Sequence, residues 1–195
     1  MALEHRISEL DTYLFAKGRH YEIYEKMGAH LAEEDGKAGT YFSVWAPNAR
    51  SVSVVGDFNN WDRTAHPMQP VQQSGIWDIF VPGVRAGDLY KFAVETSQGY
   101  TVLKADPYGN QSQLRPDNAS VVADIRYFDW TDQAWRKAHQ EKKTESPMAI
   151  YEVHPGSWKK DPSMPGEFYN FKKLAVELAD YVLEMGYTHV ELICL

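Results

Sequence analysis

The chain has 195 residues, 44% of them hydrophobic, and a formal net charge of −7, which allows one or two soluble domains with their own cores. Basic residues form no cluster, so neither nucleic acid nor a membrane surface is an expected partner. No apolar run approaches the roughly 18 residues of a membrane span. The start lacks the apolar core of a signal peptide, and the single cysteine, Cys194, cannot form an internal disulfide. We therefore expect a cytoplasmic protein.

Residues 1–37 are predicted to be a mainly helical segment, with an apolar cluster around Leu10 and Phe15. Between residues 38 and 106, short β-branched and aromatic runs alternate with turn residues about every ten positions. This pattern predicts a mainly β fold, an immunoglobulin-like β-sandwich. Trp45 and Trp77 fall within these runs and are expected in its core.

Residues 107–147 are interpreted as a connector, because prolines punctuate it and disfavour helix at the preceding residues. A short helix at about 131–140 interrupts it. Residues 148–195 then form a strand, an amphipathic helix and a second strand, with Asn170 as the expected N-cap and Gly186 after the last turn. This is the pattern of a βαβ unit with two parallel strands.

Several motifs occur in an order that resembles the amino-terminal part of bacterial glycogen (1,4-α-glucan) branching enzymes. They are Tyr13–Gly18, Trp45–Ala49, Gly56–Trp61, Gly75–Trp77, Tyr90–Phe92, Lys104–Tyr108, Ile150–Trp158 and Gly186–Leu192. The resemblance covers nearly the whole chain. It implies an early carbohydrate-binding module at 38–106 and, at 148–195, the truncated start of a catalytic (β/α)8 barrel of the α-amylase type.

The same resemblance implies a reaction that cuts α-1,4 bonds and forms α-1,6 bonds with retention, which needs two carboxyl groups about 5–5.5 Å apart. In the resembled family these groups lie on later barrel strands, and a whole barrel takes roughly 250 residues. Fewer than 50 residues follow Met148, so we assign no catalytic residue and expect the chain alone to be inactive. Glu152 and Glu191 are expected to be structural carboxylates inside the barrel.

The sequence contains no phosphate loop, nucleophile elbow or Cys-x-x-Cys pair, and no cofactor is expected. His154 and His189 lack the spacing of metal ligands, so no metal site is predicted either. These two histidines are expected to be structural or to belong to substrate loops.

A glucan-binding site is predicted in the β-domain. Trp61 follows Asn59 and Asn60 at a turn, and an indole face matches the C–H face of a pyranose. Asn59 and Asn60 are expected to supply amide groups to the same sugar. In related modules this tryptophan position stacks on glucose, and the resemblance implies that Lys91 hydrogen-bonds sugar hydroxyls. Tyr100 is the candidate second platform. The alternative is that Trp61 packs against its own loop or against the missing part of the barrel, so that the expected partner, an α-glucan, would not bind there.

Two other functions remain open: a stand-alone glucan-binding or regulatory module, and a fragment of a debranching or trehalose-releasing relative. A lone βαβ unit favours the enzyme fragment, because a binding module has no use for one. In such a unit we expect five apolar side chains to face water: Ile150, Val153, Val190, Leu192 and Ile193. A second copy of the chain is the simplest candidate for covering them.

Overall fold

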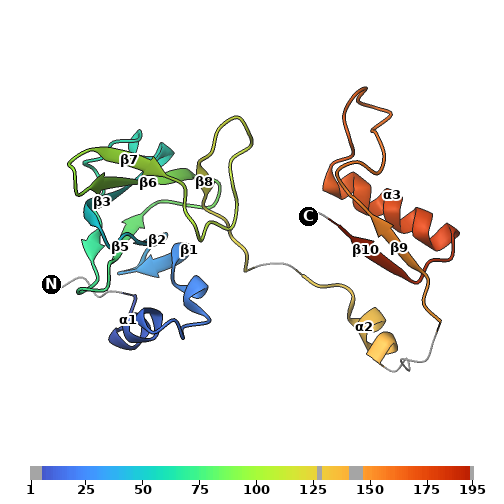
Figure 1. Ribbon diagram of the computed structural model, residues 1–195, viewed down its shortest axis with the longest axis horizontal. Coiled ribbons are helices and arrows are strands. Elements are labelled where there is room, and N and C mark those ends of the chain that lie inside the picture. Colours follow the sequence, from blue (N-terminus) through green and yellow to red (C-terminus); the bar gives the residue numbers. More distant parts are fainter. Residues whose placement is uncertain (1–5, 127–128, 141–146, 194–195) are drawn as a thin grey trace. The chain divides into compact units, whose positions relative to one another are not determined.

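The computed structural model describes residues 6–126, 129–140 and 147–193 (Figure 1). The chain divides into two units, Met1–Asp129 and Trp130–Leu195. Within the described residues, no helix is both long and apolar enough to cross a membrane.

The first unit begins with two short helices, α1 (Glu9–Ala16) and η1 (Ile23–Glu25). Ser8 caps α1, and the Asp11 carboxylate accepts hydrogen bonds from Lys26 Nζ at 2.5 Å and His20 Nε2 at 2.8 Å. These contacts connect α1 to the residues around His20 and Lys26. A small apolar cluster accompanies them: Ile7, Ile23, Met27, Val71 and Ile76.

The helical prediction for residues 1–37 is wrong in its last part, because Gly28–Glu34 is strand β1. It pairs antiparallel with β2 (Lys37–Trp45) through a tight turn at Asp35 and Gly36, with φ of 50° and 72°. Two consecutive positive φ values are the mark of a type I′ hairpin turn, and Asp-Gly is one of its preferred sequences. The Asp35–Gly36 dipeptide was therefore the sequence signal from which this hairpin could have been predicted.

Two antiparallel sheets follow, which confirms the mainly β prediction. One has the order β1-β2-β5-β4, with β4 at Gln69–Pro70 and β5 at Ile76–Pro82. The other has the order β3-β6-β7, with β3 at Ala49–Gly56, β6 at Leu89–Thr96 and β7 at Thr101–Lys104. A short strand from the predicted connector, β8 (Ser120–Val121), also pairs with β6.

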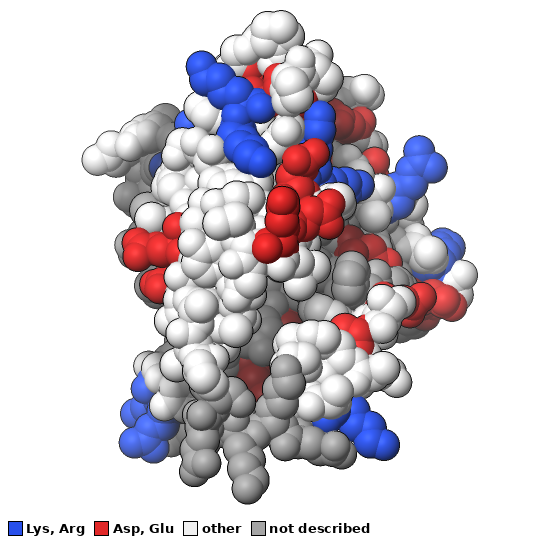
Figure 2. Space-filling model, turned by 90° about the vertical axis from the view of Figure 1, so that its right-hand side faces the viewer, with Lys and Arg blue, Asp and Glu red and all other residues white. Residues whose placement is uncertain are grey.

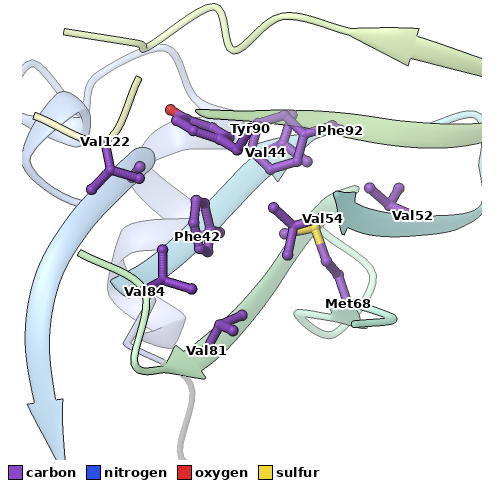
Figure 3. Packing of buried hydrophobic residues seen from close by; sticks show 11 residues of the cluster. Phe42, Val44, Val52, Val54, Met68, Val81, Val84, Tyr90, Phe92 and Val122 are labelled. Atoms are coloured by element: carbon purple, nitrogen blue, oxygen red, sulfur yellow. The ribbon is translucent and has the colours of Figure 1, made fainter. Parts of the chain in front are cut away.

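Side chains from both sheets share one core (Figure 3). Phe42 of β2 meets Tyr90 of β6 with ring centroids 5.0 Å apart, and Val54 of β3 is fully buried in the same cluster. Each such side chain contributes about 1.5–3 kcal/mol on burial. The core prediction is wrong for Trp45, which is 52% exposed at the end of β2, whereas Trp77 is half-buried against the cluster.

The second unit contains α2 (Gln133–Gln140), β9 (Ile150–Val153), α3 (Phe171–Glu184) and β10 (His189–Leu192). Strands β9 and β10 are parallel. The Asn170 side chain accepts from the Lys173 amide at 3.0 Å, which confirms the predicted N-cap of α3.

Helix α3 covers the face of this sheet that carries Tyr151, whose ring lies 5.3 Å from the ring of Tyr181. Val153 is 4% exposed, so the expectation that it faces water is wrong. Ile150, Val190 and Leu192 are 53%, 39% and 45% exposed, as expected, whereas Ile193 is half-buried.

We predict that the second unit loses structure before the first. Its buried apolar side chains are few among the described residues (Val153, Leu174 and Leu178), whereas the sandwich buries a core from two sheets. Local stability follows such burial. Hydrogen exchange should be faster at the amides of β9 and β10 than at those of β2 and β6, and limited proteolysis should first cut between about residues 127 and 147. Equal protection of the two units would contradict this.

Candidate functional site

The loop from Gly56 to Pro67 leaves the end of β3 through the short helix η2 (Asp57–Asn59) and returns along the edge of the same strand. At its return, the Val54 amide donates to the His66 carbonyl at 3.1 Å. A side chain at Gly56 would run into the Leu89 carbonyl oxygen on β6. Glycine is therefore required where the loop begins, because the backbones of β3 and β6 approach closely there.

Asn59 lies inside this loop and is only 9% exposed. Its Oδ1 accepts from the Gly56 amide at 2.9 Å, and its Nδ2 donates to the Val54 carbonyl at 3.0 Å. Nδ2 also lies 2.8 Å from His66 Nδ1. Both amide hydrogens are thus used within the loop. The structure places Asn59 as a support of the loop.

Asn60 and Trp61 both have left-handed backbones, with φ of 52° and 60°. Asparagine tolerates this conformation, but for a bulky residue it costs about 1–2 kcal/mol. Two hydrogen bonds of Trp61 stabilise this strained conformation. Its amide donates to the Gly56 carbonyl at 3.0 Å, and its Nε1 donates to Asp57 Oδ1 at 3.1 Å. Such conformations persist only where the surroundings enforce them, and they cluster at functional sites.

Lys91 stands on the outer face of the second sheet, because its neighbours Tyr90 and Phe92 both point into the core. It pairs in register with Val55, next to the Gly56–Tyr90 pair. The lysine therefore starts from the end of the sheet to which the Trp61 loop is attached. Its Nζ donates to Asn118 Oδ1 at 2.5 Å.

Sequence reasoning missed Asn118, which lies in the predicted connector, 27 positions from Lys91. It is exposed and comes just before β8, whose pairing with β6 brings it to the lysine. The short run Ala119–Val121 was the only local signal, and two strand residues are too few to identify by pattern.

Tyr100 lies in the turn between β6 and β7 and is 55% exposed. At about 3.3 Å per residue, this turn is about 16 Å along β6 from Lys91. The structure thus brings Asn59, Asn60, Trp61 and Lys91 to one end of the sheet and places Tyr100 at the other.

The site combines an aromatic ring with a few polar groups of both charges. Asp57 and Lys91 offer one carboxylate and one ammonium, and the amides of Asn60 and Asn118 are exposed. Hydrogen bonds from the amide and hydroxyl of Thr64, both 2.8 Å long, lower the pKa of the nearby Asp62 carboxyl. Mixed donors and acceptors beside an aromatic face suit a neutral, hydroxylated ligand better than an ion.

The second unit presents carboxylates of its own. Glu152 and Glu191 are register partners on the strands, both exposed, on the face opposite Tyr151 and α3. His154 Nδ1 contacts Ser157 Oγ, and His189 Nδ1 contacts Thr188 Oγ1, each at 2.8 Å. Across the described ranges, no group of three or more His, Cys, Asp or Glu could hold a metal ion. On the face that Figure 2 shows, acidic and basic side chains lie beside one another.

Residues 26–109 match the family model of carbohydrate-binding module 48 (isoamylase N-terminal domain). The chain is 52% identical to a 1,4-alpha-glucan branching enzyme GlgB of Protochlamydia amoebophila, over 95% of the chain and 25% of that protein. It is 48% identical to the corresponding enzyme of Marinobacter nauticus, over 96% of the chain and 30% of that protein. The chain therefore spans less than a third of the length of these relatives.

Among solved structures, the chain is similar to the product complex of a multi-modular glycogen-degrading pneumococcal virulence factor, SpuA. The TM-score is 0.60 at 24% identity, and the match covers 86% of this chain and 19% of the other. At this identity the likeness concerns the fold alone.

The adjacent asparagines provide a matched pair for testing the loop. We predict that Asn59→Ala lowers the free energy of unfolding of the sandwich by about 2–4 kcal/mol, because it leaves the Gly56 amide and the Val54 carbonyl unpaired and buried. Asn60→Ala should cost about 1 kcal/mol, since only tolerance of the left-handed backbone is lost. Urea denaturation of the full chain measures both. Equal losses would contradict the internal role of Asn59.

Proposed function

We propose that the chain binds α-glucan through Trp61, Lys91 and Asn118, because residues 26–109 match the family model of carbohydrate-binding module 48. The observation that carries this proposal is the strained loop that holds the Trp61 indole at the end of the sheet where Lys91 emerges. The ring would stack on one glucose. The lysine and Asn118, already joined at 2.5 Å, would share hydroxyls of the same or the next sugar.

Two further residues take different parts in this proposal. Asn59 supports the loop from inside, whereas the exposed Asn60 can offer its amide to a hydroxyl. Tyr100, at the far end of β6, would contact only a ligand that extends along the sheet. Its role as a second platform stays a prediction.

We further propose that the chain is part of a 1,4-α-glucan branching enzyme, as its similarity to such enzymes over 95% of its length suggests. Such an enzyme would cut an α-1,4 bond, hold the glycosyl group on a carboxylate, and pass it to a 6-hydroxyl. In this proposal the unit of β9, α3 and β10 is the beginning of a (β/α)8 barrel. The parallel pairing of β9 and β10, with α3 against the Tyr151 face, supports it. Parallel sheets are normally covered on both faces, so the opposite face of this pair would need further polypeptide.

We propose that the chain by itself does not catalyse this reaction. Glycosyl transfer by retention needs a carboxylic acid and a carboxylate held on either side of the bond in a site shielded from water. Glu152 and Glu191 instead stand on an exposed sheet face. The same face, with the half-exposed Ile150 beside them, is where a second copy of the chain would associate.

The binding proposal predicts that Trp61→Ala weakens glucan affinity at least about fivefold, because one aromatic stack is worth on the order of 1 kcal/mol. Affinity electrophoresis of the full chain in glycogen gels measures this. Trp45→Ala is the matched control, since Trp45 is exposed but lies at the end of β2, on the other sheet. Equal retardation of the two variants would reject Trp61 as the contact, and no retardation of the unmodified chain would reject the site.

The proposal on catalysis is checked by incubating amylose with the purified chain, then debranching the product and measuring chain lengths. We expect no new α-1,6 linkages above the blank. Their appearance, with loss of the signal in Glu152→Gln or Glu191→Gln, would show that the exposed pair is catalytic and would overturn the proposal.

A further inference from the structure

We propose that His66 is a positioning residue for Trp61: its neutral imidazole accepts a hydrogen bond from Asn59, and protonation of the ring loosens the loop and weakens glucan binding. The expected effect on glucan binding rests on the proposed function. The part that concerns the loop stands on the geometry alone.

The hydrogen bonds of Asn59 settle which nitrogen of His66 carries a proton. The Gly56 amide can only donate, so the atom it meets at 2.9 Å is Asn59 Oδ1. The Val54 carbonyl can only accept, so the atom it meets at 3.0 Å is Nδ2. Nδ2 also faces His66 Nδ1 at 2.8 Å, and because an amide nitrogen only donates, Nδ1 must accept. The imidazole is therefore neutral, with its hydrogen on Nε2.

A continuous set of contacts links this imidazole to Trp61. Asn59 joins His66 to Gly56, and the Gly56 carbonyl accepts from the Trp61 amide at 3.0 Å. The Asn59 carbonyl in turn accepts from the Asp62 amide at 3.0 Å. The left-handed residues 60 and 61 lie between these anchors. Loss of the Asn59 anchor would therefore release the strained part of the loop first.

The surroundings of His66 favour the neutral ring. Phe58 of η2 packs against it with ring centroids 5.7 Å apart, and burial lowers its pKa below the usual 6.5, while the negative charge of Asp62 opposes this. The other charged side chains of the loop are Asp57, which accepts from the Trp61 indole, and the exposed Arg63. On β3, the residue that bonds this part of the loop is Val54. It does so through its backbone amide and carbonyl, and its side chain brings no charge to the ring.

The direction of the pH effect follows from the sign of this pKa shift. A histidine whose pKa is lower in the folded state stabilises the fold fully above its unfolded pKa, and this stabilisation is lost as the pH falls through the folded value. The loop should thus be intact at pH 7.5 and loosened at pH 5. An imidazolium would turn an Nδ1–H toward the Asn59 Nδ2–H, which replaces attraction with repulsion.

The test compares the unmodified full chain, His66→Gln and His66→Ala in glycogen gels at pH 7.5 and pH 5. We expect the affinity of the unmodified chain to fall severalfold at pH 5. His66→Gln, whose Oε1 can accept from Asn59 but does not titrate, should bind similarly at both values, and His66→Ala should bind weakly at both. His30→Gln is the matched control, because burial also lowers the pKa of His30, which bonds the Met27 carbonyl outside the loop. It should keep the pH dependence of the unmodified chain.

Nitrogen NMR of the histidine-labelled chain gives a readout that does not need glucan. Its signals are assigned with His66→Gln, and His66 Nδ1 should be unprotonated at pH 7.5 and titrate below 6.5. A protonated Nδ1 at pH 7.5, or the same pH dependence of binding in the unmodified chain and His66→Gln, would overturn the proposal. If no form binds glucan at either pH, the proposed function fails. The positioning role of His66 is then tested by the NMR titration together with the pH dependence of Trp61 fluorescence.

Discussion

The alternation of side chains along β3 and β6 determines on which face of the sheet Lys91 stands. The core takes Val54 from β3 and Tyr90 and Phe92 from β6, and because neighbouring strand residues point to opposite faces, Lys91 must stand outside. A slip of one residue in the β3–β6 register would bury the lysine charge and expose the aromatic rings. The large free energy of burying those rings therefore also fixes the position of the polar site.

The Trp61 loop shows how the same sheet supports a conformation that the local sequence disfavours. Two consecutive left-handed residues, one of them tryptophan, would not hold this shape in a free peptide. Here Asn59 and Gly56 connect the loop to the end of β3 through four hydrogen bonds to backbone and side-chain atoms. The ring is thus fixed without a ligand, which would lower the entropy cost of the binding proposed above.

The sequence predicted what periodicity and local capping determine: the β-rich middle of the chain, the βαβ pattern near its end and the Asn170 cap. It failed at two strand pairings, a hairpin whose Asp-Gly turn signal was missed and a pairing between distant segments. Gly28–Glu34 becomes a strand because β2 can pair with it across the Asp35–Gly36 turn, and Asn118 reaches Lys91 only because β8 joins β6. Asn59 and Asn60, adjacent and chemically identical, receive opposite roles because one points into the loop and the other stays exposed.

The two units differ in how much each depends on further polypeptide. All the residues proposed to bind glucan, together with the core that fixes them, lie in the first unit, and both sheets of its sandwich contribute to that core. In the second unit α3 packs against the Tyr151 face of β9, while Glu152 and Ile150 on β9 and all four residues of β10 remain exposed. A parallel sheet with an open face gains stability only when something covers it. Glucan binding should therefore be separable from any catalysis, since the energy that shapes the Trp61 loop comes from within the sandwich.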